Sequence, residues 1–174
     1  MKKGFTLVEL LLVILIFGIL ASISFSAIKS GGKDLALTRS AHALASEIRK
    51  AQEMAMALRK VNGDFPSSYG VYINKHPTKI YLFADTKSPH DKYTGADKII
   101  ENFCQFEKDI CSGKVKIISL SPGTGNVLNI VFKPPYPSTI IEQNPSNSEA
   151  QIILQNDAGT KIIKIYKSGL ISIE

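Results

Sequence analysis

Three hydrophobic patterns follow one another along the chain. Residues 5–28 are almost uniformly apolar, residues 29–61 carry apolar side chains at helical spacing, and residues 62–174 contain short alternating runs interrupted by glycine and proline. A stretch of roughly 24 apolar residues is about 36 Å long as a helix, which is enough to cross a bilayer. The sequence therefore predicts a transmembrane half-helix, an amphipathic half-helix and a globular β-rich domain.

The amphipathic half presents one apolar stripe, whose seven members recur at alternating steps of four and three residues. This spacing also suits a parallel coiled coil, but three of the seven are alanine, which favours a helix packed on the domain's own sheet. Gly31 and Gly32 predict a weak point before the stripe, and Asn62 and Gly63 predict that the helix ends by residue 61. The stripe consists of Leu37, Ala41, Leu44, Ile48, Ala51, Ala55 and Leu58.

The remaining chain alternates with a period of two residues, as strands do. Residues 69–73 and 79–83 predict a β-hairpin, and the short turns between later runs favour antiparallel neighbours. The proline-rich segments 133–137 and 144–148 are predicted to be loops or an edge. We expect one α+β domain, with the long N-terminal helix packed on an antiparallel sheet. Further strands are predicted at residues 98–103, 114–120, 126–132, 151–154, 161–166 and 170–173.

Charges near the N-terminus orient the apolar segment. Lys2 and Lys3 precede it, and positive flanks stay on the cytoplasmic side, so the large C-terminal domain is expected outside the cytoplasm. Glu9 lies inside the apolar run, where an ionisable side chain is expensive and commonly functional. A secretory signal peptide is one alternative, although its apolar core usually has only about 7–15 residues. A plain anchor, with Glu9 snorkelling to the near interface, is the other.

The chain reads GFTLVELL at residues 4–11, which resembles the cleavage and methylation signature of the type IV pilin superfamily. That superfamily includes major pilins, minor pilins and type II secretion pseudopilins. The resemblance implies that residues 1–4 are a leader, that prepilin peptidase cuts between Gly4 and Phe5, and that the new amino group of Phe5 is methylated. It also implies other pilin subunits and an inner-membrane assembly platform as partners, first in the cytoplasmic membrane and then in a filament on its outer side.

Processing would give Glu9 a partner of opposite charge. The freed amine of Phe5 is cationic in an apolar setting, and Glu9 of a neighbouring subunit can neutralise it. Because two bare charges in a medium of low dielectric cost several kcal/mol each, their pairing would fix both register and adhesion between subunits. We therefore expect Glu9 to act in assembly.

The strand layout is similar to that of H-type minor pseudopilins and their pilus-tip relatives. The similarity lies in a strand at residues 69–73, another at 81–85, and a closing hairpin that contains glycine. It implies a minor subunit rather than a major pilin. A pilus, a DNA-uptake system and a secretion pseudopilus all remain compatible with this sequence.

Cys104 and Cys111 are the only two cysteines in the sequence. In an exported domain such a pair favours a disulfide over free thiols, and closing a loop of about eight residues would stabilise the fold by about 2–3 kcal/mol. A C-x-x-C motif is missing and His42, His76 and His90 are far apart in sequence, so we expect a structural disulfide rather than a metal or redox site.

Three aspartates bracket a loop that holds calcium in several related subunits. Asp85, Asp91 and Asp97 lack the alternate-residue spacing of a compact calcium loop, and Lys87 and Lys92 add opposing charge. We expect these aspartates to be solvated and to bind no metal or cofactor.

The basic balance suggests one alternative partner. The chain has 21 Lys and Arg residues against 15 Asp and Glu, and loss of the leader would leave a side-chain charge of +4. Such a surplus can attract DNA, as in DNA-uptake minor pilins. Lys161 and Lys167 are expected on one face of their strand and Lys164 on the other, so this segment predicts no dense basic patch.

Enzyme signatures are not evident in the sequence. The chain shows no nucleophile elbow, zinc-binding helix or phosphate loop, so we expect a noncatalytic structural subunit. A membrane-tethered extracytoplasmic domain with another function, including an enzyme, is the alternative.

Overall fold

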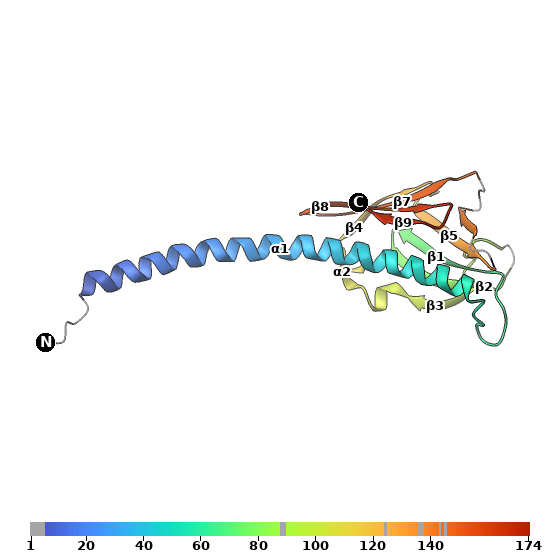
Figure 1. The fold of residues 1–174 in the computed structure, drawn as a ribbon, viewed down its shortest axis with the longest axis horizontal. Helices are drawn as coiled ribbons and strands as arrows, with labels where there is room; N and C mark the ends of the chain where they lie inside the picture. The colour runs from blue at the N-terminus through green and yellow to red at the C-terminus, as the bar shows by residue number, and fades with distance from the viewer. Residues whose placement is uncertain (1–5, 88–89, 124, 136–137, 143, 145) are drawn as a thin grey trace.

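A long helix and a β-rich head make up the molecule (Figure 1). The 50-residue helix α1 (Leu7–Met56) projects from the head with its N-terminal half, and its C-terminal half lies on the strands. The fold is therefore α+β with a long N-terminal helix packed on antiparallel sheets, as the sequence predicts. The computed structural model describes residues 6–87, 90–123, 125–135, 138–142, 144 and 146–174, and the side chains of residues 23–31 lie outside the described part.

Helix α1 runs without interruption through Gly31 and Gly32, so the expected weak point is not a break. Contacts with the head lie directly after the two glycines. The Lys33 ammonium lies 2.7 Å from Asp157 Oδ2, and the side-chain amide of Asn156 donates to the Lys33 carbonyl oxygen at 2.7 Å. These contacts hold the helix to the head directly after the glycines, each of which carries a helix penalty of about 1 kcal/mol relative to alanine.

The C-terminal end of α1 comes earlier than the sequence predicts. The helix ends at Met56 with Ala57 as its cap, rather than near residue 61. Leu58 adopts a φ of 46° and its side chain is 46% exposed, so this last member of the predicted stripe belongs neither to the helix nor to the core. The other six members are buried: Leu37, Ala41, Leu44, Ile48, Ala51 and Ala55.

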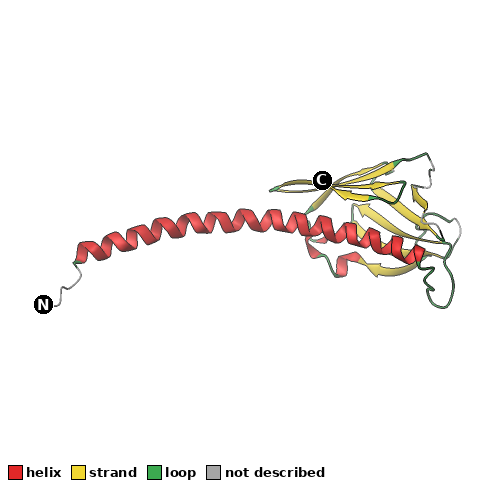
Figure 2. Cartoon of the chain, viewed as in Figure 1, coloured by secondary structure: helices red, strands yellow, loops and turns green. Residues whose placement is uncertain are grey.

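The strands form two sheets rather than the single sheet that was expected (Figure 2). The first has the order β3-β2-β1-β5-β6, and the second the order β4-β7-β8-β9. Neighbouring strands are antiparallel in both sheets. The first sheet contains β1 (Ser68–Lys75), β2 (Thr78–Asp85), β3 (Lys98–Asn102), β5 (Val127–Lys133) and β6 (Ser138–Ile141). The second contains β4 (Lys116–Ser121), β7 (Glu149–Asn156), β8 (Gly159–Tyr166) and β9 (Ile171–Ile173).

All eight predicted strands are confirmed to within two residues at each end. Strand β6 was not predicted, because it is a four-residue edge strand between the two proline-rich segments. A 3-10 turn, η1 (Phe103–Gln105), and a short helix, α2 (Lys108–Cys111), connect β3 to β4 beside α1.

The apolar stripe of α1 packs on the head's own strands. This confirms the prediction that the helix lies on the domain's own sheet rather than in a coiled coil. Leu44 and Ile48 are fully buried in one hydrophobic cluster with Val71 of β1, Ile130 of β5 and Ile163 of β8. The cluster therefore draws on both sheets. Burying such aliphatic side chains stabilises a fold by about 1.5–3 kcal/mol each, so the C-terminal half of α1 is part of the head.

Candidate functional site

The N-terminal half of α1 exposes apolar side chains in every direction. Leu10, Leu11 and Leu12 are consecutive, so they point to different sides of the helix, and they are 60%, 54% and 55% exposed. Leu7 and Phe17 are exposed by 78% and 69%. A helix that is apolar all round is normally covered by protein or lipid, so this segment marks an interaction surface.

No helix in the described part of the chain is both long enough and apolar enough to span a membrane. The transmembrane segment expected at residues 5–28 stays a prediction.

Glu9 caps the helix in which it lies. Its Oε2 accepts hydrogen bonds from the Thr6 backbone nitrogen at 2.9 Å and from the Thr6 hydroxyl at 2.8 Å. The Thr6 hydroxyl oxygen accepts in turn from the Glu9 backbone nitrogen at 3.3 Å, which completes a capping box. The pattern Thr-x-x-Glu is a known sequence signal for such a cap, although it stands here inside the apolar run. The carboxylate therefore points toward the chain end that would carry the processed amine.

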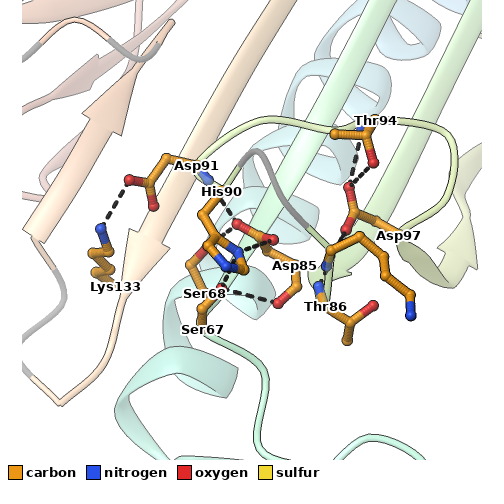
Figure 3. Close-up of polar contacts among 10 residues, drawn as sticks. Ser67, Ser68, Asp85, Thr86, His90, Asp91, Thr94, Asp97 and Lys133 are labelled. Atoms are coloured by element: carbon orange, nitrogen blue, oxygen red, sulfur yellow. Dashed lines mark hydrogen bonds and ion pairs between the residues drawn. The ribbon is translucent and has the colours of Figure 1, made fainter.

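A second polar arrangement lies in the loop after β2 (Figure 3). Asp85, the last residue of β2, is fully buried. Its Oδ2 accepts from the Ser68 hydroxyl at 3.0 Å and from the Asp91 backbone nitrogen at 2.6 Å, and its Oδ1 lies 2.9 Å from His90 Nδ1. The carboxylate thus anchors one end of the loop to the sheet.

Asp97 anchors the other end of the same loop and is only 6% exposed. Its Oδ1 accepts from the backbone nitrogens of Thr86 and Lys87, both at 3.1 Å. Its Oδ2 accepts from the Thr94 backbone nitrogen at 2.9 Å and from the Thr94 hydroxyl at 2.8 Å. Backbone donors therefore satisfy a buried carboxylate, as burial of a charge requires.

The expectation of solvated aspartates is wrong for Asp85 and Asp97. Sequence spacing could not show that the loop folds back over its own ends and supplies them with donors. Asp91 pairs with Lys133 at 2.8 Å. Among the residues that the structure describes, no cluster of three side chains is suited to hold a metal ion.

Ser67, His90 and Asp85 lie together but do not have the geometry of a catalytic triad. His90 Nδ1 is 3.0 Å from Ser67 Oγ and 2.9 Å from Asp85 Oδ1, so both partners meet the same ring nitrogen. The Ser67 hydroxyl also lies within donating distance of the Asp85 carbonyl oxygen, at 3.0 Å. A triad needs the serine and the carboxylate on opposite ring nitrogens. The contacts instead tie the loop to β2.

Tyr93, in the middle of this loop, packs its ring against three aromatic side chains of β1 and β2. The Tyr93 ring lies 4.8 Å from that of Tyr72, 5.8 Å from that of Tyr81 and 5.3 Å from that of Phe83, measured between centroids. Burial raises the pKa of the Tyr93 hydroxyl, and the neighbouring tyrosines add to this effect. The loop is therefore a packed part of the head.

Residues 1–25 match a family model described as the prokaryotic N-terminal methylation motif. This match makes the N-terminal segment similar to that of type IV pilin-like proteins. The motif supports processing by prepilin peptidase and implies assembly with other pilin subunits. No curated protein and no solved structure matches the chain. Gly4 and Phe5, the expected processing residues, lie outside the described residues, so their roles stay predictions.

The head contains the expected disulfide. Cys104 in η1 and Cys111 at the end of α2 are bonded, with 5.6 Å between their Cα atoms. The Ser40 hydroxyl of α1 donates to Glu107 Oε1 at 3.1 Å. The bridged segment is thereby held against the helix, and the prediction of a structural bridge is confirmed.

Acidic partners lie beside several of the lysines that could contact DNA. Lys164 of β8, which lies between Lys161 and Lys167 in the sequence, pairs with Glu174 at 2.7 Å. Four other described lysines also pair with carboxylates, so these lysines do not form a purely basic patch for phosphates. They are Lys33, Lys50, Lys114 and Lys133.

Proposed function

We propose that this chain is a noncatalytic filament subunit, a minor pilin or pseudopilin of a type IV pilus or type II secretion-like system. Prepilin peptidase cuts it between Gly4 and Phe5 and methylates Phe5. Residues 5–28 hold the processed chain in the cytoplasmic membrane with the head on the outer side. The observation that carries the proposal is the bare apolar half of α1, which bears the methylation motif and projects away from the head.

The capping box supports a specific assembly step at Glu9. In the single chain this carboxylate satisfies the nitrogen and hydroxyl of Thr6, at the N-terminal end of the helix dipole. Cleavage places a cationic amine one residue before Thr6. When apolar helices of two subunits lie side by side, the Glu9 carboxylate of one exchanges the Thr6 contacts for the Phe5 amine of the other. A charge pair in an apolar medium is favoured strongly over two separate charges, so this exchange sets the register.

The strand layout supports a minor rather than a major subunit. The features that resemble H-type minor pseudopilins are found in β1, β2 and the hairpin of β8 and β9. Quantitative mass spectrometry of purified filaments measures the ratio of this subunit to the major pilin. A minor subunit is expected at a small fraction of the major pilin, and a chain that forms most of the filament mass would contradict this assignment.

The first test of the proposal is the N-terminus of the native protein. Intact mass and N-terminal sequencing of membrane-derived protein should give a chain that begins at methylated Phe5. The same protein from cells without the peptidase should begin at Met1. A native chain that begins at Met1 in both strains, or beyond residue 28, would overturn the proposal.

The second test changes Glu9 and uses Thr6 as its control. Glu9→Leu removes the pairing charge and the Glu9 half of the capping box, whereas Thr6→Val removes the hydroxyl half of the box but keeps the carboxylate. We expect Glu9→Leu to enter the membrane normally and to fall at least about tenfold in filament incorporation, because an unpaired buried amine costs several kcal/mol. Thr6→Val should retain most incorporation. Immunoblots of sheared filaments and membranes measure both, and equal incorporation of the two variants would refute the Glu9 exchange.

A further inference from the structure

A groove crosses the end of the head where α1 finishes, at the opposite end of the helix from the projecting half (Figure 1). Its central hollow of about 390 Å³ lies between the last turns of α1, the loop that follows the helix and strand β3. All of residues 98–101 in β3 line this hollow. Because consecutive residues of a strand point to opposite faces, the hollow follows the edge of β3. Strand β3 is an edge of the first sheet, so this side has no strand partner in the described structure.

The central hollow continues into a second and a third one. A hollow of about 530 Å³ along α1 shares Lys50 and Arg59 with it. A hollow of about 520 Å³ beside the loop after β2 shares Asn62 and Lys98 with it. Shared walls make the three hollows one elongated groove, and this shape is suited to an extended chain rather than to a compact small molecule.

Cations dominate the centre of the groove. Its one carboxylate, that of Glu101, is in contact with the Lys50 ammonium. Arg59 and Lys98 are exposed, and neither side chain pairs with a carboxylate among the described residues. The centre of the groove therefore favours an anionic ligand. The cations that line it are Lys50, Arg59, Lys60 and Lys98.

The two ends of the groove differ from its centre because they carry acids. Glu53 at one end and Asp64 at the other are exposed. Asp85 and Asp97 also line the end beside the loop after β2, where they are buried and accept hydrogen bonds from that loop. A long polyanion such as a nucleic acid would meet repulsion at both ends, whereas a short acidic segment would face only the basic centre.

The uncharged lining also favours a peptide over a nucleic acid. Single-stranded nucleic acids need aromatic rings on which successive bases stack. Phe65 is the one phenylalanine that lines the groove, and the Lys60 ammonium already lies 4.8 Å from the centroid of its ring. Ile99 is 41% exposed in the centre and can be covered by an apolar side chain. A peptide supplies such side chains together with carboxylates.

The edge of β3 adds a further reason for a peptide. A peptide backbone has both donors and acceptors, which match the backbone groups along the edge of a strand. A bulge interrupts the pairing of β3 with β2, so the backbone pairing that this edge offers is short. The charges must therefore supply most of the specificity.

The chain itself has no acidic segment suited to this groove. In the described structure, the exposed carboxylates without a side-chain partner are Asp34, Glu53 and Asp64, and they are far apart in sequence. The occupant is therefore a different protein rather than a second copy.

We propose that the groove binds a short, extended acidic segment of another protein. Carboxylates of this segment pair with Arg59 and Lys98, and an apolar side chain between them packs on Ile99. The site belongs to the head alone, so it goes beyond the proposed function and does not rest on processing or membrane anchoring.

Fluorescence anisotropy of the full chain in detergent micelles tests this. The labelled probe is a short peptide in which glutamate alternates with valine, compared with the same peptide in which glutamine replaces glutamate. We expect the acidic peptide to bind at least about tenfold more tightly, and the difference to shrink as salt screens the charges. Arg59→Gln with Lys98→Gln should remove most of this difference. The control, Lys79→Gln with Lys116→Gln, removes the same charge from two exposed sites outside the groove and should leave it unchanged.

Circular dichroism checks that both double variants keep the native fold. Equal affinities for the two peptides, or equal losses in the two double variants, would overturn the site. Oligothymidylate that binds as tightly as the acidic peptide would make the groove a nucleic-acid site, and self-association that the acidic peptide reverses would assign it to a second copy. Either result would overturn the proposal. Because the peptide readout requires neither cleavage nor filament assembly, its failure would leave the proposed function standing.

Discussion

Glu47 is a buried acid on the inner side of α1, and hydrogen bonds from described residues do not satisfy both of its carboxylate oxygens. Its side chain is 7% exposed, and its Oε1 has no hydrogen-bond partner among the described residues. Burial raises the pKa of the Glu47 carboxyl, the charge of Glu101 raises it further, and Lys50 acts in the opposite direction. A raised pKa means that the folded state binds a proton more tightly than the unfolded chain. Stability from this group is therefore greatest at low pH and is lost as the pH rises.

Replacement of Glu47 by glutamine should stabilise the head in a pH-dependent way. At pH 7 we expect Glu47→Gln to raise the free energy of unfolding by about 1 kcal/mol, because the buried charge is removed. The gain should shrink as the pH falls toward the unfolded-state pKa of 4.5, where the native acid is also protonated. Urea denaturation from pH 4 to pH 8 measures this. Glu53→Gln is the control, because Glu53 is exposed on the same helix, and a gain that does not vary with pH would contradict the argument.

At the scale of elements, the centre of the first sheet depends on one glycine. Gly70 of β1 lies opposite Phe83 of β2 and Val131 of β5. A Cβ at this position would lie 2.7 Å from the Ile130 carbonyl oxygen and 2.8 Å from the Phe83 ring. Phe83 is fully buried, and the ring of Tyr93, from the loop after β2, packs against it. Gly70 therefore leaves the space that the Phe83 ring occupies.

Gly70→Ala should destabilise the head by about 1–3 kcal/mol, the usual penalty for overpacking. The matched control is Gly32→Ala in α1, where a Cβ meets no atom within 4 Å. That control should be neutral or should stabilise by up to about 1 kcal/mol, because alanine favours a helix. Thermal unfolding followed by circular dichroism compares the two variants. Similar melting temperatures for both would show that the sheet accommodates the methyl group.

The bridged segment between β3 and β4 makes its own contribution to stability. Replacing Cys104 and Cys111 together by serine should lower the free energy of unfolding by about 2–3 kcal/mol, because a closed loop of about eight residues restricts the unfolded chain. Reductant should lower the free energy of unfolding of the native protein to that of the double variant, and it should leave the stability of the double variant unchanged. Chemical denaturation with and without reductant checks this, and alkylation of the native protein without reductant would contradict the bridge.

At the scale of the whole molecule, the two halves of α1 have different partners. The half after Lys33 is buried in the head with Leu44 and Ile48, whereas the half before residue 21 has large exposed side chains such as Phe17. The head should therefore be complete without the first 28 residues. The projecting half should determine association.

A chain that lacks residues 1–28 should stay folded and monomeric in buffer, while the full chain should need detergent. The reason is that the deletion removes exposed apolar surface but none of the side chains in the core cluster. Light scattering coupled to gel filtration and circular dichroism measure mass and folding. A truncated chain that still associates would place an additional self-association surface on the head.

Much of this molecule follows from local signals in its sequence. Spacing between near neighbours in the sequence was enough to predict four features. They are the apolar run with its single acid, the helical stripe from Leu37 to Ala55, most strands, and the pairing of Cys104 with Cys111. Periodicity reports which side chains share a face, and this property does not need the rest of the fold.

The tertiary structure decided what depends on contacts between distant segments. The division into two sheets follows from the pairing of β1 with β5 and of β4 with β7, which lie far apart in sequence. The burial of Asp85 and Asp97 also depends on a loop that folds back to supply hydrogen-bond donors. Local spacing can indicate what a segment prefers, but only the folded chain shows which donors and which apolar surface reach it.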